Sequence, residues 1–445
     1  MKKGDKKVIR GWVFYDWANS VYNLVIASAI FPIFYNNITT NRFLSDNNLE
    51  TLPEGMEVTV EFFGATISSS VLMSFVLSAS FLVVSILSPM LSGVADVSGS
   101  KKRFMQFFNY MGATACISLF WFQDVPIEVG ILSIFIASIG FWNSLVFYNA
   151  YLPEIAEPKD HDRISARGFS MGYLGSMILL VICLGIVMFT GENGSNTSWS
   201  FVLVGIWWFS FSQITYKVLP NNVYGKKKEK GAVWKGFKEL QKVFKEFAKT
   251  KRLKRYLAAF FFFNTGVQTV MIMAVYFADK EIEWPEDDGG AGLIVSILLI
   301  QVLGALGAFL MSKVSQRIGN IKTLSISVSI WVLICVAAYF VKTPTDFYML
   351  AAAVGLVMGG VQAIARSTYS KFLPETTDHA SYFSFYDVTE KVGMVVGTFS
   401  FGFLQLWLGS IRYSVVSVAA FFFIGLILLF LVPKEETLPI AKTAK

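Results

Sequence analysis

Twelve apolar blocks, most of them about 20 to 26 residues long, decide what this 445-residue chain can fold into. A helix of that length rises about 1.5 Å per residue and crosses a hydrocarbon core about 30 Å thick. The sequence therefore predicts an all-α integral membrane protein with twelve transmembrane helices. In chain order, the blocks cover 11–36, 67–92, 104–123, 126–151, 166–190, 198–219, 255–279, 291–314, 320–341, 344–371, 381–408 and 411–432.

The composition excludes two other classes of protein. Charged residues make up only 16% of the chain, whereas an ordinary soluble domain carries about a quarter. Too few polar side chains remain to cover the surface of soluble domains, so a soluble enzyme is excluded. The net charge of +7 comes from basic residues scattered between apolar blocks. That pattern excludes the contiguous basic surface of a nucleic-acid-binding protein.

Cysteine and histidine provide no pattern typical of a metal site. Cys116, Cys183 and Cys335 lie inside apolar blocks without paired spacing, and His161 and His379 lie in connections between blocks. We therefore expect no metal ligands, no cofactor and no catalytic residues, and we interpret the cysteines as small core residues.

The distribution of lysine and arginine predicts the orientation, because these residues resist translocation. Of the 38 lysines and arginines, four (Arg42, Lys280, Lys342 and Arg412) fall in connections on one side and two lie inside spans, which leaves 32 on the other side. The basic side is predicted to be cytoplasmic and to hold both termini. If the chain is bacterial, the membrane is the inner membrane.

The longest basic connection divides the spans six and six. We expect an N-terminal six-helix half over 1–219, a cytoplasmic linker over 220–254 and a C-terminal six-helix half over 255–445. Apolar side chains recur in the linker at helical spacing with lysines between them, which predicts an amphipathic helix at the lipid surface. A calmodulin-like partner site is the alternative. The apolar side chains are Trp234, Phe237, Leu240, Phe244 and Phe247.

Two short loops occupy the same place in the two halves. The stretches 96–102 and 316–322 each follow the second span of their half, with their glycines 220 residues apart. An ancient duplication would leave such a repeat. In the second copy, Gln316 stands where the first copy has an acid.

The first loop resembles the signature loop of the major facilitator superfamily, in which an acid is followed by a glycine turn and two basic residues. The matching residues are Asp96, Gly99, Lys101 and Lys102. Six further stretches resemble the vacuolar amino-acid effluxer-like, autophagy-related branch of that superfamily. They are 16–22, 148–154, 165–168, 264–269, 359–367 and 385–388.

This resemblance implies a fold and an activity. The implied fold is the major facilitator fold, with two pseudo-symmetric six-helix halves around a central cavity lined by the first, fourth, seventh and tenth helices. The implied activity is export of amino acids or similar compounds. Thr265 stands where the branch usually has an acid.

Five charged residues lie inside the predicted spans, where a charge costs at least a few kcal/mol unless it is paired or hydrated. They are Asp16, Arg366, Asp387, Glu390 and Lys391. Helical rise places each of them roughly 8–15 Å from the basic ends of the spans. We therefore expect one layer, in which the three residues of the eleventh span face Arg366. The residues expected to extend this layer at the membrane surface are Asp96, Glu154, Arg163 and Arg167.

Two interpretations of this charged layer stay open. In the first, the charges only lock helices together. In the second, they form a cytoplasmic gate whose ion pairs join the two halves, and a carboxylate in it carries a proton when its surroundings change between states.

Neutral polar side chains lie deeper, in the first, fourth, seventh and tenth spans. Amides can bind an ammonium, a carboxylate or a carbonyl without a permanent buried charge, so we expect a substrate site for a polar or zwitterionic molecule. Hydrogen bonding between helices is the alternative role. The candidates are Asn19, Tyr22, Asn23, Asn143, Tyr148, Asn264, Gln268 and Gln362.

Together these patterns favour a secondary active transporter that works by alternating access. The sequence lacks the Gly-x-x-x-x-Gly-Lys-Ser/Thr loop of ATP-driven proteins, so protons are the simplest energy source. We expect a monomer whose partners are its solute and membrane lipid. The alternatives are a transport-inactive receptor or scaffold, a multidrug-type efflux carrier, and an intramembrane enzyme, which would need a His/Asp pair or a metal cluster within the spans.

Overall fold

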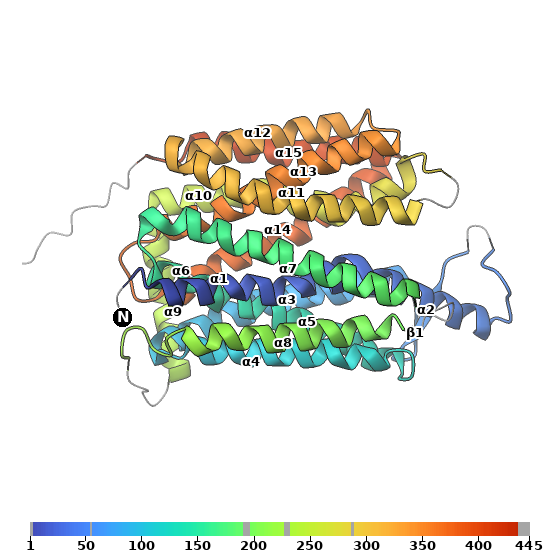
Figure 1. Cartoon of the computed structure of the whole chain (residues 1–445), viewed down its shortest axis with the longest axis horizontal. Coiled ribbons are helices and arrows are strands. Elements are labelled where there is room, and N and C mark those ends of the chain that lie inside the picture. Colours follow the sequence, from blue (N-terminus) through green and yellow to red (C-terminus); the bar gives the residue numbers. More distant parts are fainter. Residues whose placement is uncertain (1–2, 54–55, 190–195, 227–231, 286–288, 435–445) are drawn as a thin grey trace, which may run out of the picture.

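The computed structural model describes residues 3–53, 56–189, 196–226, 232–285 and 289–434. In these ranges nearly all of the chain is helical, and the long helices run side by side along one axis (Figure 1). The helices before the linker are α1 (Lys6–Val21), the π-helix η1 (Tyr22–Ile30), α2 (Phe31–Asp46), α3 (Ser69–Ser98), α4 (Lys101–Ser118), η2 (Leu119–Trp121), α5 (Ile127–Ala150), α6 (Leu152–Ile155), η3 (Pro158–Asp160), α7 (His161–Phe189) and α8 (Ser198–Val218).

The remaining helices follow the same pattern. The linker contributes α9 (Ala232–Lys249), where the sequence predicts the amphipathic helix. The second half consists of α10 (Lys251–Glu281), α11 (Gly289–Ile318), α12 (Asn320–Ala338), α13 (Pro344–Phe372), α14 (His379–Leu408) and α15 (Ile411–Phe430).

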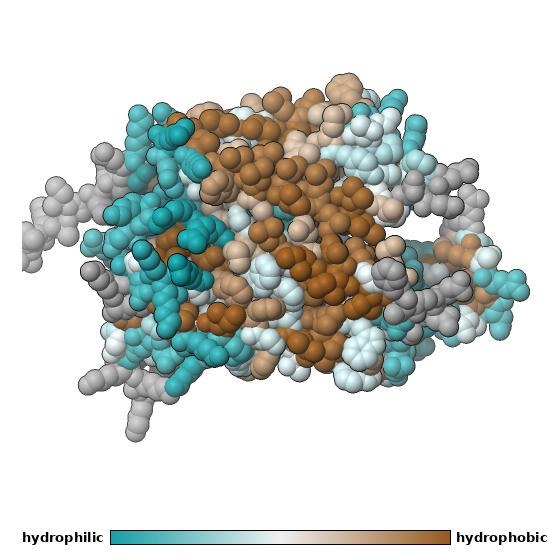
Figure 2. Space-filling view, viewed as in Figure 1, coloured by the Kyte–Doolittle hydropathy of each residue, from teal (hydrophilic) through white to brown (hydrophobic). Residues whose placement is uncertain are grey.

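On the face shown in Figure 2, an apolar belt crosses the middle of the molecule, with hydrophilic residues gathered at the two ends. Within the described ranges, nine helical stretches are long and apolar enough to cross a membrane, and the chain is a multi-pass membrane protein. The predicted spans 104–123, 198–219 and 381–408 coincide with α4, α8 and α14, which are not among the nine. The count of twelve spans therefore stays a prediction, as do the boundaries of the two halves and the linker.

We name the two ends by their residues. The basic end holds Lys6, Lys101 and Lys159, and the opposite end holds Asn47 and Glu128. The basic end is the one that the distribution of lysine and arginine predicts to be cytoplasmic.

The first helical stretch is longer than predicted, because it runs from Lys6 through a π-helix to Asp46 rather than stopping at residue 36. Its polar last turns are held by side-chain contacts. Thr39 is fully buried with its hydroxyl 3.0 Å from that of Ser69, and the Arg42 guanidinium donates to the carbonyl of Gln123 at 2.8 Å. Hydropathy does not report such contacts.

A small antiparallel hairpin, β1 (Thr59–Phe62) and β2 (Ala65–Ser68), lies in the connection before α3. The predicted all-α fold class is confirmed, and this short hairpin is a local addition to it. The hairpin turns at Phe63 and Gly64, which both have positive φ.

The two halves lie one above the other in Figure 1, with α7 and α14 between them. The first-half helix α7 packs against α11 and α13, and the second-half helix α14 packs against α3 and α5. The glycines of the repeated loops make the sharp turns between α3 and α4 and between α11 and α12. Gly99 has φ +63° and Gly319 has φ +89°, which glycine adopts without strain.

Candidate functional site

A cavity of about 220 Å³ lies between the two halves. Its walls come from α1, η1, α5 and α7 on one side and from α10, α11, α13 and α14 on the other. It extends from Asp16 and Arg366, toward the basic end, to Ser28 and Val275, which are exposed nearer the opposite end. The cavity is therefore the place where both halves can contact one solute.

Five of the eight predicted substrate-binding residues lie on the wall of this cavity. They come from both halves and are all amides: Asn19, Asn23, Asn264, Gln268 and Gln362. Gln362 also joins the halves, because its Oε1 accepts a hydrogen bond from the Tyr173 hydroxyl at 2.6 Å.

The other three predicted residues lie off the cavity wall. The ring of Tyr22 packs 4.8 Å from that of Phe141. Asn143 donates to the carbonyl of Ile139 in its own helix at 3.1 Å. Tyr148 donates to Asp16 at 2.8 Å and so supports an ion pair. Sequence spacing identifies polar residues on a helix but does not fix how that helix is rotated about its axis.

Two amide groups on the wall are buried donors without a partner. Asn19 is 1% exposed and Asn264 is 5% exposed, and neither Nδ2 has a hydrogen-bond partner among the described residues. A buried N–H without an acceptor costs roughly 1–3 kcal/mol. The two donors, one from each half, therefore favour a solute that carries an acceptor oxygen.

An ion pair between the halves closes the cavity toward the basic end. Arg366 Nη2 lies 3.1 Å from Asp16 Oδ2, and both side chains are nearly fully buried. The guanidinium also donates from Nε to the Ser165 hydroxyl at 2.9 Å and from Nη1 to Asn149 at 3.3 Å. The central carbon of the guanidinium, Cζ, lies 4.1 Å from the centre of the Phe169 ring. Arg366 thus joins α13 to α1, α5 and α7.

The prediction that the charges of the eleventh span face Arg366 is wrong. These charges instead form a separate cluster on α14. Lys391 Nζ lies 3.1 Å from Asp387 and 3.0 Å from Glu390. It also sits 3.5 Å above the ring of Trp142, on α5 of the other half. Glu390 lines the cavity and accepts from Gln268 at 3.2 Å. The charges therefore form two clusters rather than one layer.

Asp96 and Glu154 both bind the start of α14 at the basic end. Asp96 accepts from the backbone N–H groups of Ala380 at 3.2 Å and Ser381 at 2.7 Å. A carboxylate at the N-terminus of a helix is stabilised by the free N–H groups and the helix dipole. Glu154 pairs with Lys101 and lies 3.2 Å from His379 Nδ1. The predicted Arg167 instead lies exposed on α7.

The first residues of the linker join these contacts. The Tyr224 hydroxyl lies 3.2 Å from His379 Nδ1, and Lys226 Nζ lies 3.2 Å from Asp378. Burial, reinforced by the Glu154 carboxylate, raises the pKa of Tyr224. The hydroxyl therefore stays a neutral hydrogen-bonding group between the linker and α14.

Asp162 is a site residue that sequence reasoning missed. This buried carboxylate at the start of α7 accepts four hydrogen bonds from the other half. The donors are the hydroxyls of Ser315 (2.8 Å) and Ser367 (2.7 Å), the amide of Asn320 (2.7 Å) and the ammonium of Lys371 (2.6 Å).

The second repeated loop gave the signal that could have located Asp162. Gln316 leaves this copy without its acid, and Asp162 of the first half supplies a carboxylate beside it, bound to Ser315 and Asn320. An acid missing from one copy of a repeat is a reason to look for its replacement on a neighbouring helix.

The hydrogen bonds and ion pairs between the halves that are described above lie at the basic end or at the level of Tyr173. The described residues therefore hold the molecule closed at the basic end. The cavity reaches exposed side chains only in the other direction.

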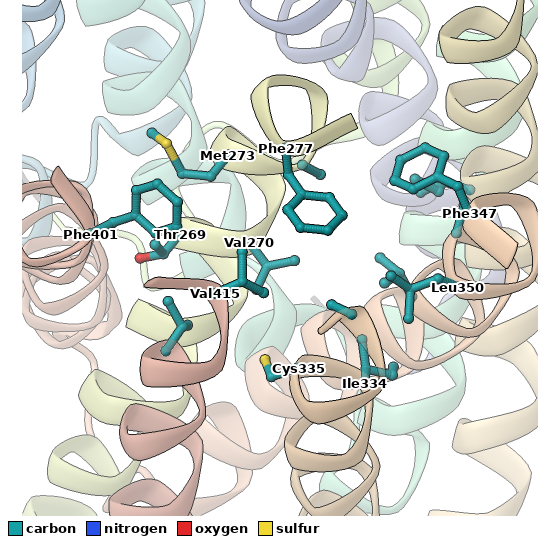
Figure 3. A pocket seen from close by; sticks show the side chains of 16 residues that line it. Thr269, Val270, Met273, Phe277, Ile334, Cys335, Phe347, Leu350, Phe401 and Val415 are labelled. Atoms are coloured by element: carbon teal, nitrogen blue, oxygen red, sulfur yellow. The ribbon is translucent and has the colours of Figure 1, made fainter. Parts of the chain in front are cut away.

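A second, smaller cavity of about 50 Å³ lies inside the second half (Figure 3). Side chains such as Phe277, Phe347 and Leu350 point into it from several helices, and nearly all of its lining is apolar. It adjoins the central cavity, because Val270 and Val354 line both. An apolar part of a solute bound centrally would find complementary surface here.

Comparison with known proteins identifies the family. The family model described as "Vacuole effluxer Atg22 like" matches residues 4–441. The chain belongs to this family. The Atg22-like resemblance of the sequence motifs is thereby confirmed, and the chain is a transporter of the major facilitator type.

Curated relatives match the Atg22-like chain over nearly its whole length. It is 28% identical over 450 residues to YxiO of Bacillus subtilis (strain 168), named as an uncharacterized MFS-type transporter, with 99% of this chain and 98% of YxiO covered. It is 23% identical over 541 residues to autophagy-related protein 22-1 of Penicillium rubens, with 97% and 90% covered.

Solved structures confirm the major facilitator fold of this Atg22-like protein. The human organic anion transporter MFSD10 superposes with a TM-score of 0.71 at 11% identity, covering 96% of this chain and 100% of MFSD10. The proton:xylose symporter XylE superposes with a TM-score of 0.69 at 12% identity, covering 96% and 95%. Such low identities show the fold alone.

Proposed function

We propose that this protein is a secondary active transporter that exports a small polar or zwitterionic solute, an amino acid or a related metabolite, by proton-coupled alternating access. The observation that carries the proposal is the pair of buried, unpartnered amide donors, Asn19 and Asn264, on one cavity between the halves. A solute that carries acceptor oxygens could satisfy these donors from within the cavity. The family description "vacuole effluxer" supports export.

The charges around the cavity support a zwitterionic solute. Arg366 and Glu390 line the same cavity toward the basic end. A solute that carries both an anionic and a cationic group can engage opposite charges there, in addition to the amides. A purely apolar solute would leave the two amide donors unsatisfied, which disfavours it.

The closed basic end supports alternating access. If the basic end is cytoplasmic, as the distribution of lysine and arginine predicts, the described conformation faces outward. Export then requires that the Asp16–Arg366 pair and the contacts of Asp96, Glu154 and Asp162 break, so that the cavity opens to the cytoplasm.

Proton coupling rests on carboxylates that the cavity reaches. Asp16 and Glu390 both line it, and each is paired with a cation. Protonation of either carboxylate would weaken its ion pair and favour the other conformation. This couples proton movement to opening of the basic end.

The test is solute flux in proteoliposomes that contain the purified protein. A thermal-shift screen of metabolites first selects the solute. We expect its flux to follow an imposed proton gradient, and Asn264→Ala to weaken its binding at least about tenfold through the lost hydrogen bond. Gln213→Ala is the matched control, because this amide lies on α8 away from the cavity. Unchanged affinity in Asn264→Ala, or flux indifferent to the gradient, contradicts the corresponding part of the proposal.

The apolar side cavity favours one second candidate, a multidrug-type efflux carrier. Its lining around Phe277 and Phe347 would accommodate an apolar group. Transport of amphipathic dyes, impaired by Val354→Asp more than by Asn264→Ala, would support this candidate over a polar solute. We propose a monomer in either case, with solute and membrane lipid as its partners.

A further inference from the structure

The linker helix α9 has one apolar face that is docked on the bundle. Val243 is fully buried. A Cβ atom added at Gly236 would lie 2.6 Å from the backbone nitrogen of Val94 and in contact with Gly93, so the backbones of α9 and α3 meet directly. The ring of Phe247 packs 5.5 Å from that of Phe385 on α14.

This docked face joins the two halves. Helix α3 belongs to the first half and α14 to the second, and these two helices pack together along one seam between the halves. Helix α9 contacts both. Two residues before α9 also contact the start of α14: Tyr224 bonds to His379, and Lys226 pairs with Asp378. Movement of α3 away from α14 at the basic end must therefore undock α9.

A second, outer face of α9 carries exposed apolar side chains. Trp234 is 74% exposed, Phe237 42% and Phe244 57%. Phe244 lies at the border of the two faces, because its ring also packs 5.9 Å from that of Phe385 on α14. Lysines lie between these aromatic residues, and Lys238, Lys245 and Lys249 are exposed as well. Aromatic residues interleaved with lysines are typical of helices that bind the interface of an anionic membrane.

The position of α9 places this outer face at the level of lipid headgroups. Gly93, which it contacts, lies five residues before the end of α3 at Ser98, or roughly 8 Å along the helix. Helix α9 thus lies against the side of the bundle at the edge of the apolar belt, where headgroups meet the protein.

We propose that α9 is a sensor of anionic lipid that controls the seam between the halves. Its exposed aromatic residues enter the membrane interface and its lysines bind anionic headgroups. Because its other face joins α3 to α14, this binding stabilises the conformation closed at the basic end. The proposal depends neither on the solute nor on proton coupling.

The experiment uses the full chain in nanodiscs with two spin-label readouts. A label at Gln241→Cys on α9 reports contact with lipid through relaxation by dissolved oxygen. A label pair at Lys159→Cys and Lys322→Cys, exposed at the basic end of the two halves, reports their separation. The native cysteines Cys116, Cys183 and Cys335 are buried.

We expect about 30 mol% anionic lipid to increase lipid contact at position 241 and to raise the ratio of closed to open conformation at least about threefold. The variant K238Q/K245Q/K249Q should lose both responses. Gly236→Val should keep the response at 241 and lose the response of the label pair, because the outer face is intact while the docked face is not. The control K6Q/K7Q/R10Q removes three exposed charges from the same end and should keep both responses.

Three outcomes would overturn the proposal. The first is a label pair that does not respond to anionic lipid in the unaltered protein. The second is an equal loss of response in the N-terminal control, which would indicate a general charge effect. The third is a dimer in mild detergent that Trp234→Ala dissociates, which would make the outer face a surface for a second copy.

Discussion

Gly168 on α7 makes room for the ion pair that closes the cavity. A Cβ atom at this position would lie 2.3 Å from Asp16 Oδ2 and 2.9 Å from Arg366 Nη2. The pair itself is buried among aromatic rings, where a charge without its partner is costly. The ion pair can therefore form only because position 168 carries no side chain beyond a hydrogen atom.

Gly168→Ala should displace the ion pair and destabilise the closed conformation by about 1–2 kcal/mol. The measurement is the population of the label pair at Lys159 and Lys322. Gly185→Ala, on the same helix with nothing within 4 Å of its added Cβ, should leave that population unchanged. Equal effects of the two variants would contradict the role given to Gly168.

Asp162 and Lys371 should behave as an interacting pair in a double-mutant cycle. Asp162→Asn and Lys371→Gln should each destabilise the contact between α7 and the second half. The free-energy loss in the double variant should be smaller than the sum of the two single losses. The expected coupling is about 1–3 kcal/mol, because the contact is short and Asp162 is buried. Additive effects would show that the two side chains act independently.

At the scale of elements, α11 and α13 approach each other through glycines. A Cβ atom at Gly359 would lie 2.0 Å from the carbonyl oxygen of Gly304, and one at Gly307 would lie 1.9 Å from that of Leu356. Backbone atoms cannot rotate aside as a side chain can. The contact between these helices therefore depends on the absence of side chains at these positions.

Gly359→Ala should force the two helices apart and lower thermal stability by an amount equivalent to about 1–3 kcal/mol. Gly402→Ala is the control, because its added Cβ meets nothing within 4 Å. A thermal melt of the purified protein in detergent provides the measurement. An unchanged melting temperature for Gly359→Ala would contradict this packing.

The helices themselves were largely predictable, and their details were not. Apolar blocks located the long helices of the described residues other than α9, because length and hydropathy decide what enters a membrane. Helix α9 was predicted instead from the helical spacing of apolar residues in the linker. The π-helix η1 was missed, since a change of hydrogen-bond pattern leaves no trace in hydropathy. Its side chains Asn23 and Ser28 line the cavity, so this irregular stretch contributes to the candidate site.

The site was predictable in its chemistry but only partly in its members. Polar residues in apolar blocks are few, so Asn19, Asn264 and Gln268 could be selected from the sequence alone. Tyr22 and Asn143 were selected by the same rule and lie off the cavity, because helix rotation depends on packing between helices. Asp162 escaped because it lies at a helix start, where an acid is unremarkable until its partners in the other half are known.

For the whole molecule, the described conformation predicts which positions a membrane-impermeant thiol reagent can reach. Ser28→Cys should react in intact cells, because it is exposed on the side to which the cavity extends. Lys159→Cys, exposed at the basic end, should react only after permeabilisation. Labelling of Lys159→Cys in intact cells would reverse the predicted orientation.

The two seams between the halves differ in how easily substitutions can change their strength. Where α3 meets the start of α14, Asp96 binds backbone N–H groups, which no ordinary substitution at Ala380 or Ser381 removes. Where α7 meets the second half, Asp162 binds only side chains, and any of them can be exchanged. Evolution can therefore adjust the ease of opening at the second seam one residue at a time, whereas the Asp96 contact at the first seam does not depend on which side chains stand at positions 380 and 381.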